Sequence, residues 1–222
     1  MHNSADSFVS IVDYGMGNLF SVKQACEFVG LKAVIVSEAD DILRSSGLIL
    51  PGVGAFGNAV TTLRKLDLIN PILDFIRSGR PFMGICLGMQ LLFNESEEFG
   101  RNTGLGVIPG EVLRFSKGEE KVPEVGWNTI NMPLGFELDL WQNSPLKDIY
   151  PGEYMYFVHS FYCKPRDEKH LLSTTHYAGV DYCSSIQHQN ICAFQFHPEK
   201  SAYEGLKIYR NWAKQINQLY EN

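Results

Sequence analysis

Residues 8 to 93 alternate short apolar runs with longer amphipathic segments, and this alternation restricts the possible fold more than any other feature of the sequence. The apolar runs predict strands at Phe8–Asp13, Lys32–Val36, Gly47–Leu50 and Pro81–Ile85, with Pro51 ending the third. The amphipathic segments predict helices at Asn18–Val29, Ala55–Lys65, Pro71–Ser78 and Leu87–Phe93, with Asn18 as the first N-cap. Parallel strands that are buried on both faces are typically continuous apolar runs joined by helices. The sequence therefore predicts an α/β protein with an open, mostly parallel sheet and helices on both faces.

The sequence pattern changes between residues 104 and 196, where Gly and Pro recur and the hydrophobic residues no longer follow a helical period. Four short runs, EVLRF, YMYFVHSF, LLSTTHY and ICAFQF, predict strands of an added antiparallel portion of a mixed sheet. Tyr209, Trp212 and Ile216 recur at spacings of three and four within Ser201–Leu219, which predicts a C-terminal helix packed on the sheet. Because no internal repeat, low-complexity tract or linker interrupts the chain, we expect residues 1–222 to form one domain.

Composition and charge exclude several classes of protein. The 222 residues include 19 Lys and Arg against 25 Asp and Glu, a net charge of −6, so no cationic field attracts nucleic acid or anionic lipid. No apolar segment is long enough to span a membrane, and no basic region followed by an apolar stretch marks a secretory signal. We therefore expect a cytoplasmic protein. The five cysteines form no C-x-x-C pair, which argues against disulfides and zinc, and we expect no metal or organic cofactor.

The pentapeptide Gly84-Ile85-Cys86-Leu87-Gly88 lies where a predicted strand meets a predicted helix. This is the pattern of a nucleophile elbow with sulfur in place of oxygen, in which small residues let two backbones approach closely. A helix N-terminus behind Cys86 favours its thiolate form. The alternative interpretation is a buried cysteine between two structural glycines.

A second candidate element follows the apolar run ICAFQF, at the end of a predicted strand, where catalytic groups gather in open α/β sheets. There His197 is placed to exchange a proton with a thiol and a leaving amine, and Glu199 to orient the imidazole. The alternative is a loop or capping histidine beside Pro198. Among the other histidines, we interpret His159 as structural.

The third element is the glycine-containing loop after the strand GLIL. The backbone N–H groups of Gly52, Val53 and Gly54 are placed to act with that of Leu87 on an oxyanion. An ordinary strand-to-helix turn is the alternative. Together, a nucleophile, a base pair and oxyanion donors at strand ends indicate covalent hydrolysis of a small amide or ester.

These residues resemble a known family. The segments GICLGMQ (84–90) and QFHPEKS (195–201) are similar to those of class I, triad-type glutamine amidotransferases. Within that class, DYGMGN (13–18), PGVGAF (51–56), GWN (126–128) and YFVHSFY (156–162) resemble the glutaminase subunits of imidazole glycerol phosphate synthase. The resemblance implies a single glutamine amidotransferase type 1 domain with a flavodoxin-like open sheet.

The resemblance also implies a reaction and a partner. Cys86 attacks the side-chain amide of L-glutamine, ammonia leaves, and water hydrolyses the γ-glutamyl thioester, with His197 and Glu199 completing the triad. The ammonia passes to a cyclase subunit of barrel fold in a heterodimer. The cyclase makes imidazole glycerol phosphate and aminoimidazole carboxamide ribotide in histidine biosynthesis.

Further residues take expected roles from the same resemblance. Gln90, Glu98 and the backbone of Ser160 and Phe161 match positions that bind glutamine. Gly52, Val53 and Gly54 match the oxyanion loop, which the resemblance implies is switched by the partner. Lys200 and Tyr156 match positions at the subunit interface, near the ammonia passage.

Two positions depart from the family pattern. Glu124 stands where a His is usual, and Phe20 where an Arg is common. Both lie outside the triad, and both bear on which partner docks. The alternative function is therefore a paralogous glutaminase that supplies ammonia to a surface-sugar amidotransferase. Two further alternatives remain. One is a cysteine hydrolase of the α/β-hydrolase or stress-protein type, and the other is a non-catalytic interaction subunit.

Overall fold

The computed structural model describes residues 8–116, 120–137 and 139–221. A central sheet begins with five parallel strands, in the spatial order β2 (Ala33–Val36), β1 (Val9–Val12), β3 (Gly47–Gly52), β4 (Phe82–Cys86) and β13 (Ile191–Phe194). If β13 is counted as the fifth strand, this order, 2-1-3-4-5, is that of a flavodoxin-like fold. The prediction of an open parallel sheet is confirmed, and ligands in such sheets bind at the carboxyl ends of the strands.

The sheet continues beyond β13 as a mostly antiparallel extension. Its strands follow in the order β12 (Val180–His188), β10 (Phe161–Pro165), β7 (Ile108–Arg114), β5 (Phe93–Ser96) and β6 (Asn102–Thr103), and β11 (Leu171–Tyr177) also pairs with β12. A separate two-stranded sheet is made of β8 (Glu124–Ile130) and β9 (Glu153–His159), and the short helix α6 (Asp139–Gln142) precedes β9. These strands confirm the added antiparallel portion.

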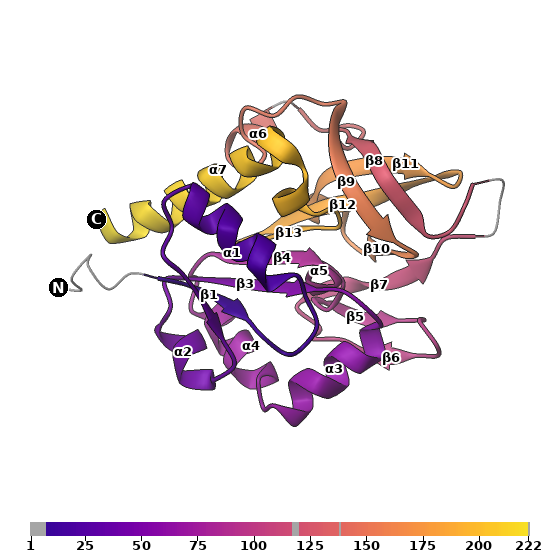
Figure 1. Cartoon of the computed structure of the whole chain (residues 1–222). Coiled ribbons are helices and arrows are strands. Elements are labelled where there is room, and N and C mark those ends of the chain that lie inside the picture. The colour runs from indigo at the N-terminus through magenta and orange to yellow at the C-terminus, as the bar shows by residue number, and fades with distance from the viewer. Residues whose placement is uncertain (1–7, 117–119, 138, 222) are drawn as a thin grey trace.

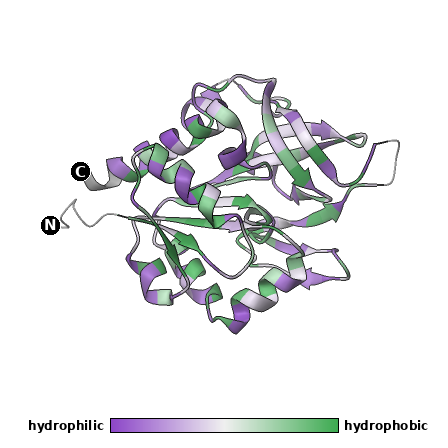
Figure 2. Ribbon diagram, in the orientation of Figure 1, coloured by the Kyte–Doolittle hydropathy of each residue, from purple (hydrophilic) through white to green (hydrophobic). Residues whose placement is uncertain are grey.

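Helices cover both faces of the parallel strands (Figure 1). On one face lie α1 (Leu19–Phe28) and α7 (Ala202–Glu221), and on the other lie α2 (Ala39–Arg44), α3 (Phe56–Lys65) and α4 (Ile69–Arg77). The Oδ1 atom of Asn18 accepts a hydrogen bond from the Ser21 amide, so the predicted N-cap is confirmed. Figure 2 shows hydrophobic residues concentrated on the central strands, between the helix layers.

Two predicted elements differ in the structure. The helix expected at Leu87–Phe93 ends early, as α5 (Leu87–Gln90), and Phe93 begins strand β5. Because every residue from 87 to 93 is buried, the segment is apolar on all sides and its periodicity does not separate helix from strand.

Strand β3 does not end at Leu50 but continues through Pro51 to Gly52. Its pairing with β1 stops at Ile49, and beyond that point it pairs only with β4. A proline, which has no N–H to donate, is tolerated where one side of a strand is unpaired.

Among the described residues, we find no helix whose length and hydropathy would let it cross a bilayer. All five cysteines lie in the described part of the chain, and none forms a disulfide.

Candidate active site

Cys86 ends strand β4 and directly precedes α5, at the carboxyl edge of the parallel sheet. Its φ of 53° lies in the left-handed region, which is strained for a residue with a side chain. A Cβ at Gly88 would collide with the carbonyl oxygen of Leu50, and one at Gly84 would lie 3.0 Å from the Cβ of Ala193. The backbone at Cys86 therefore forms the predicted elbow, and close packing requires glycine at both flanking positions.

The Cys86 sulfur is nearly buried, with the residue 6% exposed. The side-chain amide of Gln195 donates to it at 3.7 Å, and the Val158 carbonyl oxygen lies 4.0 Å away. By contrast, burial raises the pKa of the thiols of Cys163, Cys183 and Cys192, and that of Cys26 to about 12. Those four cysteines are held as neutral thiols, so Cys86 is the candidate nucleophile.

His197 and Glu199 form a buried pair beside Cys86. The Nδ1 atom of His197 lies 2.8 Å from Oε1 of Glu199, and both side chains are almost fully buried. Burial lowers the pKa of His197, but interaction with the Cys86 thiolate and the Glu199 carboxylate outweighs burial and raises it to about 10. Within the described part of the chain, the buried Nε2 atom of His197 has no hydrogen-bond partner. This nitrogen is therefore available for proton transfer.

The backbone of the His197 segment is fixed from two sides. The His197 amide donates to the Tyr156 carbonyl oxygen at 2.9 Å, and the Ser201 hydroxyl donates to the His197 carbonyl oxygen at 2.7 Å. Pro198, with its restricted φ, begins the short 3-10 turn that carries Glu199. These contacts hold the imidazole in place without any contribution from substrate.

The expected oxyanion loop follows β3 at the same edge. Gly52 is the register partner of Cys86 on the neighbouring strand, and a Cβ at Gly52 would lie 3.0 Å from the Cβ of Leu87. Gly54 has a φ of +105°, and Val53 is exposed. Thus the structure brings Gly52 and Leu87 together beside the nucleophile, and Val53 and Gly54 follow Gly52 in the loop.

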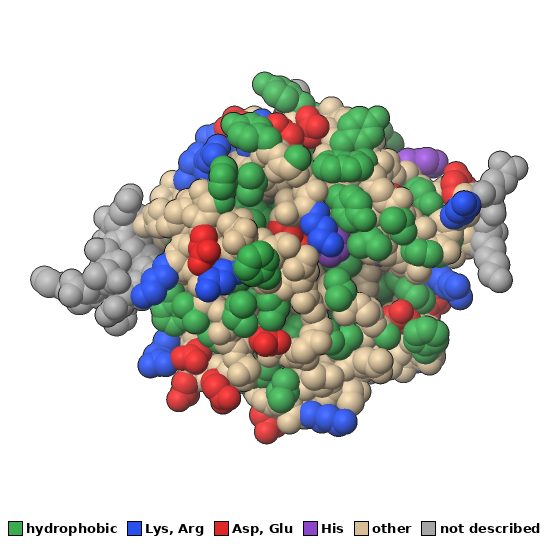
Figure 3. Space-filling model, in the orientation of Figure 1, with side chains coloured by type: hydrophobic (Ala, Val, Ile, Leu, Met, Phe, Trp, Pro, Cys, Tyr) green, Lys and Arg blue, Asp and Glu red, His purple; other side chains and the backbone are tan. Residues whose placement is uncertain are grey.

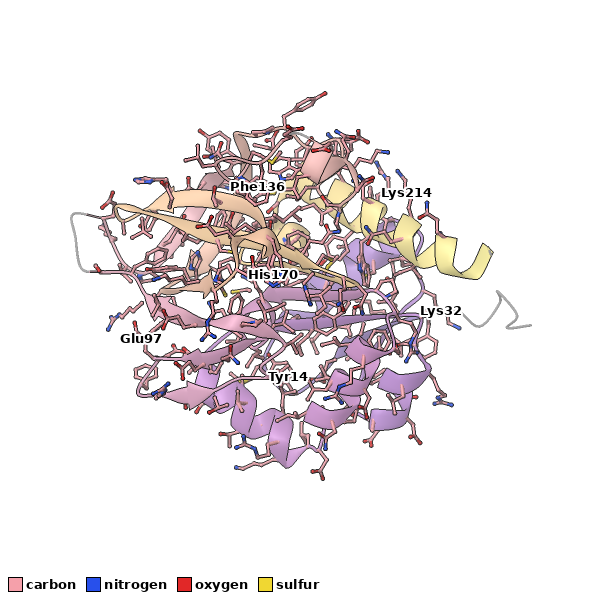
Figure 4. The ribbon with its side chains drawn as sticks, turned by 180° about the vertical axis from the view of Figure 1, so that it is seen from behind. Tyr14, Lys32, Glu97, Phe136, His170 and Lys214 are labelled. Atoms are coloured by element: carbon pink, nitrogen blue, oxygen red, sulfur yellow. The ribbon has the colours of Figure 1, made fainter. Side chains whose placement is uncertain are left out.

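Tyr14, labelled in Figure 4, packs against this loop. Its buried hydroxyl donates to the Pro51 carbonyl oxygen at 2.9 Å, and a Cβ at Gly52 would collide with it. The hydroxyl therefore fixes the start of the loop and forbids a side chain at Gly52.

The expected glutamine-binding residues do not all gather at one point. Gln90 is buried, and its Nε2 donates to the Phe161 carbonyl oxygen and to Oε1 of Gln195, both at 3.0 Å. Glu98 instead accepts from the Phe56 amide at the start of α3, at 2.6 Å. Gln90, Phe161 and the adjoining Ser160 lie on one side of the nucleophile, and Glu98 is anchored next to the oxyanion loop.

The expected interface residues lie together at the rim of the site. The Nζ atom of Lys200 lies 5.8 Å from the ring centroid of Tyr156, whose ring is 6.1 Å from that of Trp127. Val125, Trp127 and Tyr154 are exposed nearby on β8 and β9. Figure 3 shows hydrophobic side chains gathered over these two strands. We call the set Val125, Trp127, Tyr154 and Tyr156 the β8–β9 patch.

Gln195 and Tyr14 are functional residues that no sequence pattern singles out. They lie inside the motifs QFHPEKS and DYGMGN, which mark the segments but not these two side chains. Their roles depend on contacts with Cys86 and Pro51, which are distant in the sequence. Among the described residues, we find no group of three or more His, Cys, Asp or Glu side chains arranged to hold a metal.

Comparison with known proteins identifies the family to which this fold belongs. The sequence profile of the family "Glutamine amidotransferase class-I" matches residues 10–216. A solved glutamine amidotransferase superposes with a TM-score of 0.71 at 17% identity, covering 95% of this chain and 100% of that one. PurLQS from Thermotoga maritima superposes with a TM-score of 0.69 at 17% identity, covering 96% and 99%. The fold is that of a class-I glutamine amidotransferase.

Sequence relatives narrow the assignment. The imidazole glycerol phosphate synthase subunit HisH of Geobacter metallireducens is 45% identical over 92% of this chain and 97% of its own length. The HisH subunits of Chlorobaculum tepidum, at 42% over 93% and 99%, and of Aquifex aeolicus, at 43% over 94% and 97%, are comparably similar. The chain therefore belongs to the class-I glutamine amidotransferase family and, within it, to the HisH subunits of imidazole glycerol phosphate synthase.

Proposed function

We propose that this chain hydrolyses L-glutamine through Cys86, His197 and Glu199, and that it delivers the ammonia to the cyclase subunit of imidazole glycerol phosphate synthase for histidine biosynthesis. One observation carries the catalytic assignment. A cysteine on a strained turn lies beside a buried imidazole that is already paired with a carboxylate at 2.8 Å. This arrangement has the nucleophile, the proton carrier and the orienting group of a cysteine triad.

In the first half of the reaction, the Cys86 thiolate attacks the side-chain carbonyl carbon of glutamine. The negative charge on the amide oxygen is stabilised by backbone N–H groups of the loop at Gly52–Gly54 and of Leu87. His197 gives its Nε2 proton to the amide nitrogen, the C–N bond breaks, and ammonia leaves. The sulfur now carries a γ-glutamyl thioester.

In the second half, neutral His197 accepts a proton from a water molecule that attacks the thioester carbon. The C–S bond breaks, glutamate is released, and the sulfur returns to the thiolate paired with imidazolium. The Glu199 carboxylate favours the charged imidazole at both stages. Gln90, Glu98 and the Ser160–Phe161 backbone bind the α-amino and carboxylate groups of the substrate.

The first prediction concerns Glu199. Glu199→Gln removes the charge that stabilises the His197 imidazolium, so kcat should fall by at least about a hundredfold. Since His197 with a pKa of about 10 keeps its proton below that pH, activity of the unaltered chain is lost on the alkaline side as pH rises through about 10. In the variant, this alkaline loss of activity should begin at a lower pH than in the unaltered chain. A pH profile of kcat/KM for both proteins tests this, and an unmoved alkaline limb would contradict the role of Glu199.

The β8–β9 patch is the proposed docking surface for the cyclase, with Lys200 at its edge. Trp127 is half exposed and packs against Tyr156, whose carbonyl oxygen accepts from the His197 amide. Aromatic side chains of this kind carry much of the binding energy in protein interfaces. The patch is therefore directly connected to the catalytic segment.

The second prediction is that Trp127→Ala weakens binding of the cyclase subunit by about thirtyfold or more. Calorimetric titration of the two subunits measures the change. Phe28→Ala is the control, because Phe28 is an aromatic residue at least as exposed as Trp127 but lies on α1, outside the patch. If both variants bind alike, the docking surface lies elsewhere.

The assay that tests the proposed function is glutamate release from glutamine by the chain alone and with the cyclase subunit and its nucleotide substrate. We expect strong stimulation in the second case. Glu124 and Phe20 depart from the family pattern at positions that bear on docking, so the alternative acceptor of the ammonia is a surface-sugar amidotransferase. Stimulation by that protein and not by the cyclase would replace the histidine assignment and leave the chemistry intact.

A further inference from the structure

Glu124 and His159 form a buried polar cluster outside the triad. They are register partners on β8 and β9, and both side chains are 3% exposed. The Nε2 atom of His159 lies 3.3 Å from Oε2 of Glu124, and the Tyr182 hydroxyl donates to the same oxygen at 2.9 Å. The other carboxylate oxygen accepts from the Asn128 amide at 2.8 Å. Burial of such charged groups is unfavourable unless they are paired, so the cluster requires an explanation.

The partners of His159 fix the orientation of its ring. Its Nδ1 atom lies 2.9 Å from the Phe161 carbonyl oxygen, which can only accept, so Nδ1 is the donor of this hydrogen bond. Its Nε2 atom lies 3.2 Å from the Tyr182 hydroxyl and 3.3 Å from Oε2 of Glu124. The ring is therefore held on both sides, by Phe161 at Nδ1 and by Tyr182 and Glu124 at Nε2.

This pair is the far end of a chain of hydrogen bonds that reaches the nucleophile. The Phe161 carbonyl oxygen accepts from His159 and also from Gln90. Gln90 in turn donates to Gln195, whose amide donates to the Cys86 sulfur. Gln90 and Phe161 are the residues to which the proposed function assigns glutamine binding.

We propose that His159 and Glu124 are positioning residues for glutamine: His159 fixes the Phe161 carbonyl, and through it the Gln90 side chain, while Glu124 holds the His159 ring from its Nε2 side. The inference rests on the proposed function, because it assigns an effect on the same glutamine pocket. It changes the interpretation of His159 from a structural residue to one that acts on substrate affinity. It also gives a use to Glu124, the residue that departs from the family pattern.

The test compares two substitutions of nearly equal shape, His159→Asn and His159→Leu, each measured with the cyclase subunit present. The Asn side chain retains an N–H donor close to the position of Nδ1, and Leu does not. We expect His159→Leu to raise the KM for glutamine about tenfold or more, with kcat changed less than about threefold. His159→Asn should recover most of the lost affinity. An unchanged KM in His159→Leu, or an equal rise in both variants, would overturn the proposal.

Glu124→Gln tests the second half of the proposal. Gln keeps the shape of Glu124, but its amide nitrogen cannot accept, so one of the hydrogen bonds from Asn128 and Tyr182 is lost and the ring is held less firmly at Nε2. We expect a smaller rise in KM, about threefold. An unchanged KM, or a rise as large as that of His159→Leu, would contradict the role of Glu124.

Two controls separate this inference from its alternatives. Trp141→Phe also removes a buried hydrogen bond, but the indole N–H donates to the Leu172 carbonyl oxygen and not to a member of the cluster, so this variant should lower stability with an unchanged KM. A rise in KM with Trp141→Phe would mean that general destabilisation explains the effect. Cys86→Ser in the same assay tests the proposed function separately: if it stops hydrolysis while His159→Leu leaves KM unchanged, only the positioning role fails.

Discussion

Glutamate release by the Cys86→Ser variant is expected to fall by about four orders of magnitude. A serine hydroxyl is a weaker nucleophile than a cysteine sulfur, and it does not form the interaction by which Cys86, together with Glu199, raises the pKa of His197 to about 10. The fold should be unaffected, because serine has nearly the same shape and the left-handed backbone at position 86 is fixed by the packing of Gly84 and Gly88. Glutamate production per subunit in the stimulated complex is the measurement.

Cys26→Ala is the matched control for this result. Cys26 is buried in α1, and burial raises the pKa of its thiol to about 12, so it does not supply a thiolate near neutral pH. Its replacement should change the rate by less than about threefold. Equal rates for Cys86→Ser and the unaltered chain would exclude the triad mechanism.

Gly88→Ala is expected to lower the free energy of unfolding by about 3 kcal/mol or more, which is a large effect for one methyl group. The added Cβ would collide with the carbonyl oxygen of Leu50, a backbone atom of the central strand β3 that cannot rotate away. Either α5 moves away from β3, or the elbow opens and Cys86 loses its position. Denaturant unfolding, followed by circular dichroism, measures the loss.

Gly17→Ala serves as the control for the glycine substitution. The nearest atom to its new Cβ would be a side-chain carbon of Leu19 at 3.4 Å, an ordinary contact. Its effect should therefore stay within about 0.5 kcal/mol. If Gly88→Ala were as stable as Gly17→Ala, the close approach of α5 and β3 would not be a requirement of the elbow.

The parallel half of the fold could be predicted from sequence because its strands are continuous apolar runs and its first helix begins at a clear N-cap. Asn18 and the paired glycines at 84 and 88 are local signals of this kind. The antiparallel half is less regular. Ser160 divides the run YMYFVHSF between β9, in the small sheet, and β10, in the large one. No local propensity specifies that exchange between sheets, because the partners of each strand are distant in the sequence.

The candidate site also contains residues that a local pattern reveals and residues whose partners are distant in the sequence. Cys86, His197 and Glu199 could be proposed from sequence because each lies in a short pattern with its own physical logic. The contacts of Gln195 with Cys86, and of His159 with Glu124, join residues that no local pattern connects. The bond between the Glu98 carboxylate and the Phe56 amide at the start of α3 likewise joins residues 42 positions apart.

The most direct test of the central claim is to find the covalent intermediate. The chain, turning over glutamine in the presence of the cyclase subunit, is quenched in acid, and the peptides are analysed by mass spectrometry. We predict a γ-glutamyl thioester on the peptide that contains Cys86, and its absence when Cys86→Ser is treated in the same way. Glutamate release with no acyl group on Cys86, or with the group on another residue, would contradict the mechanism proposed for this chain.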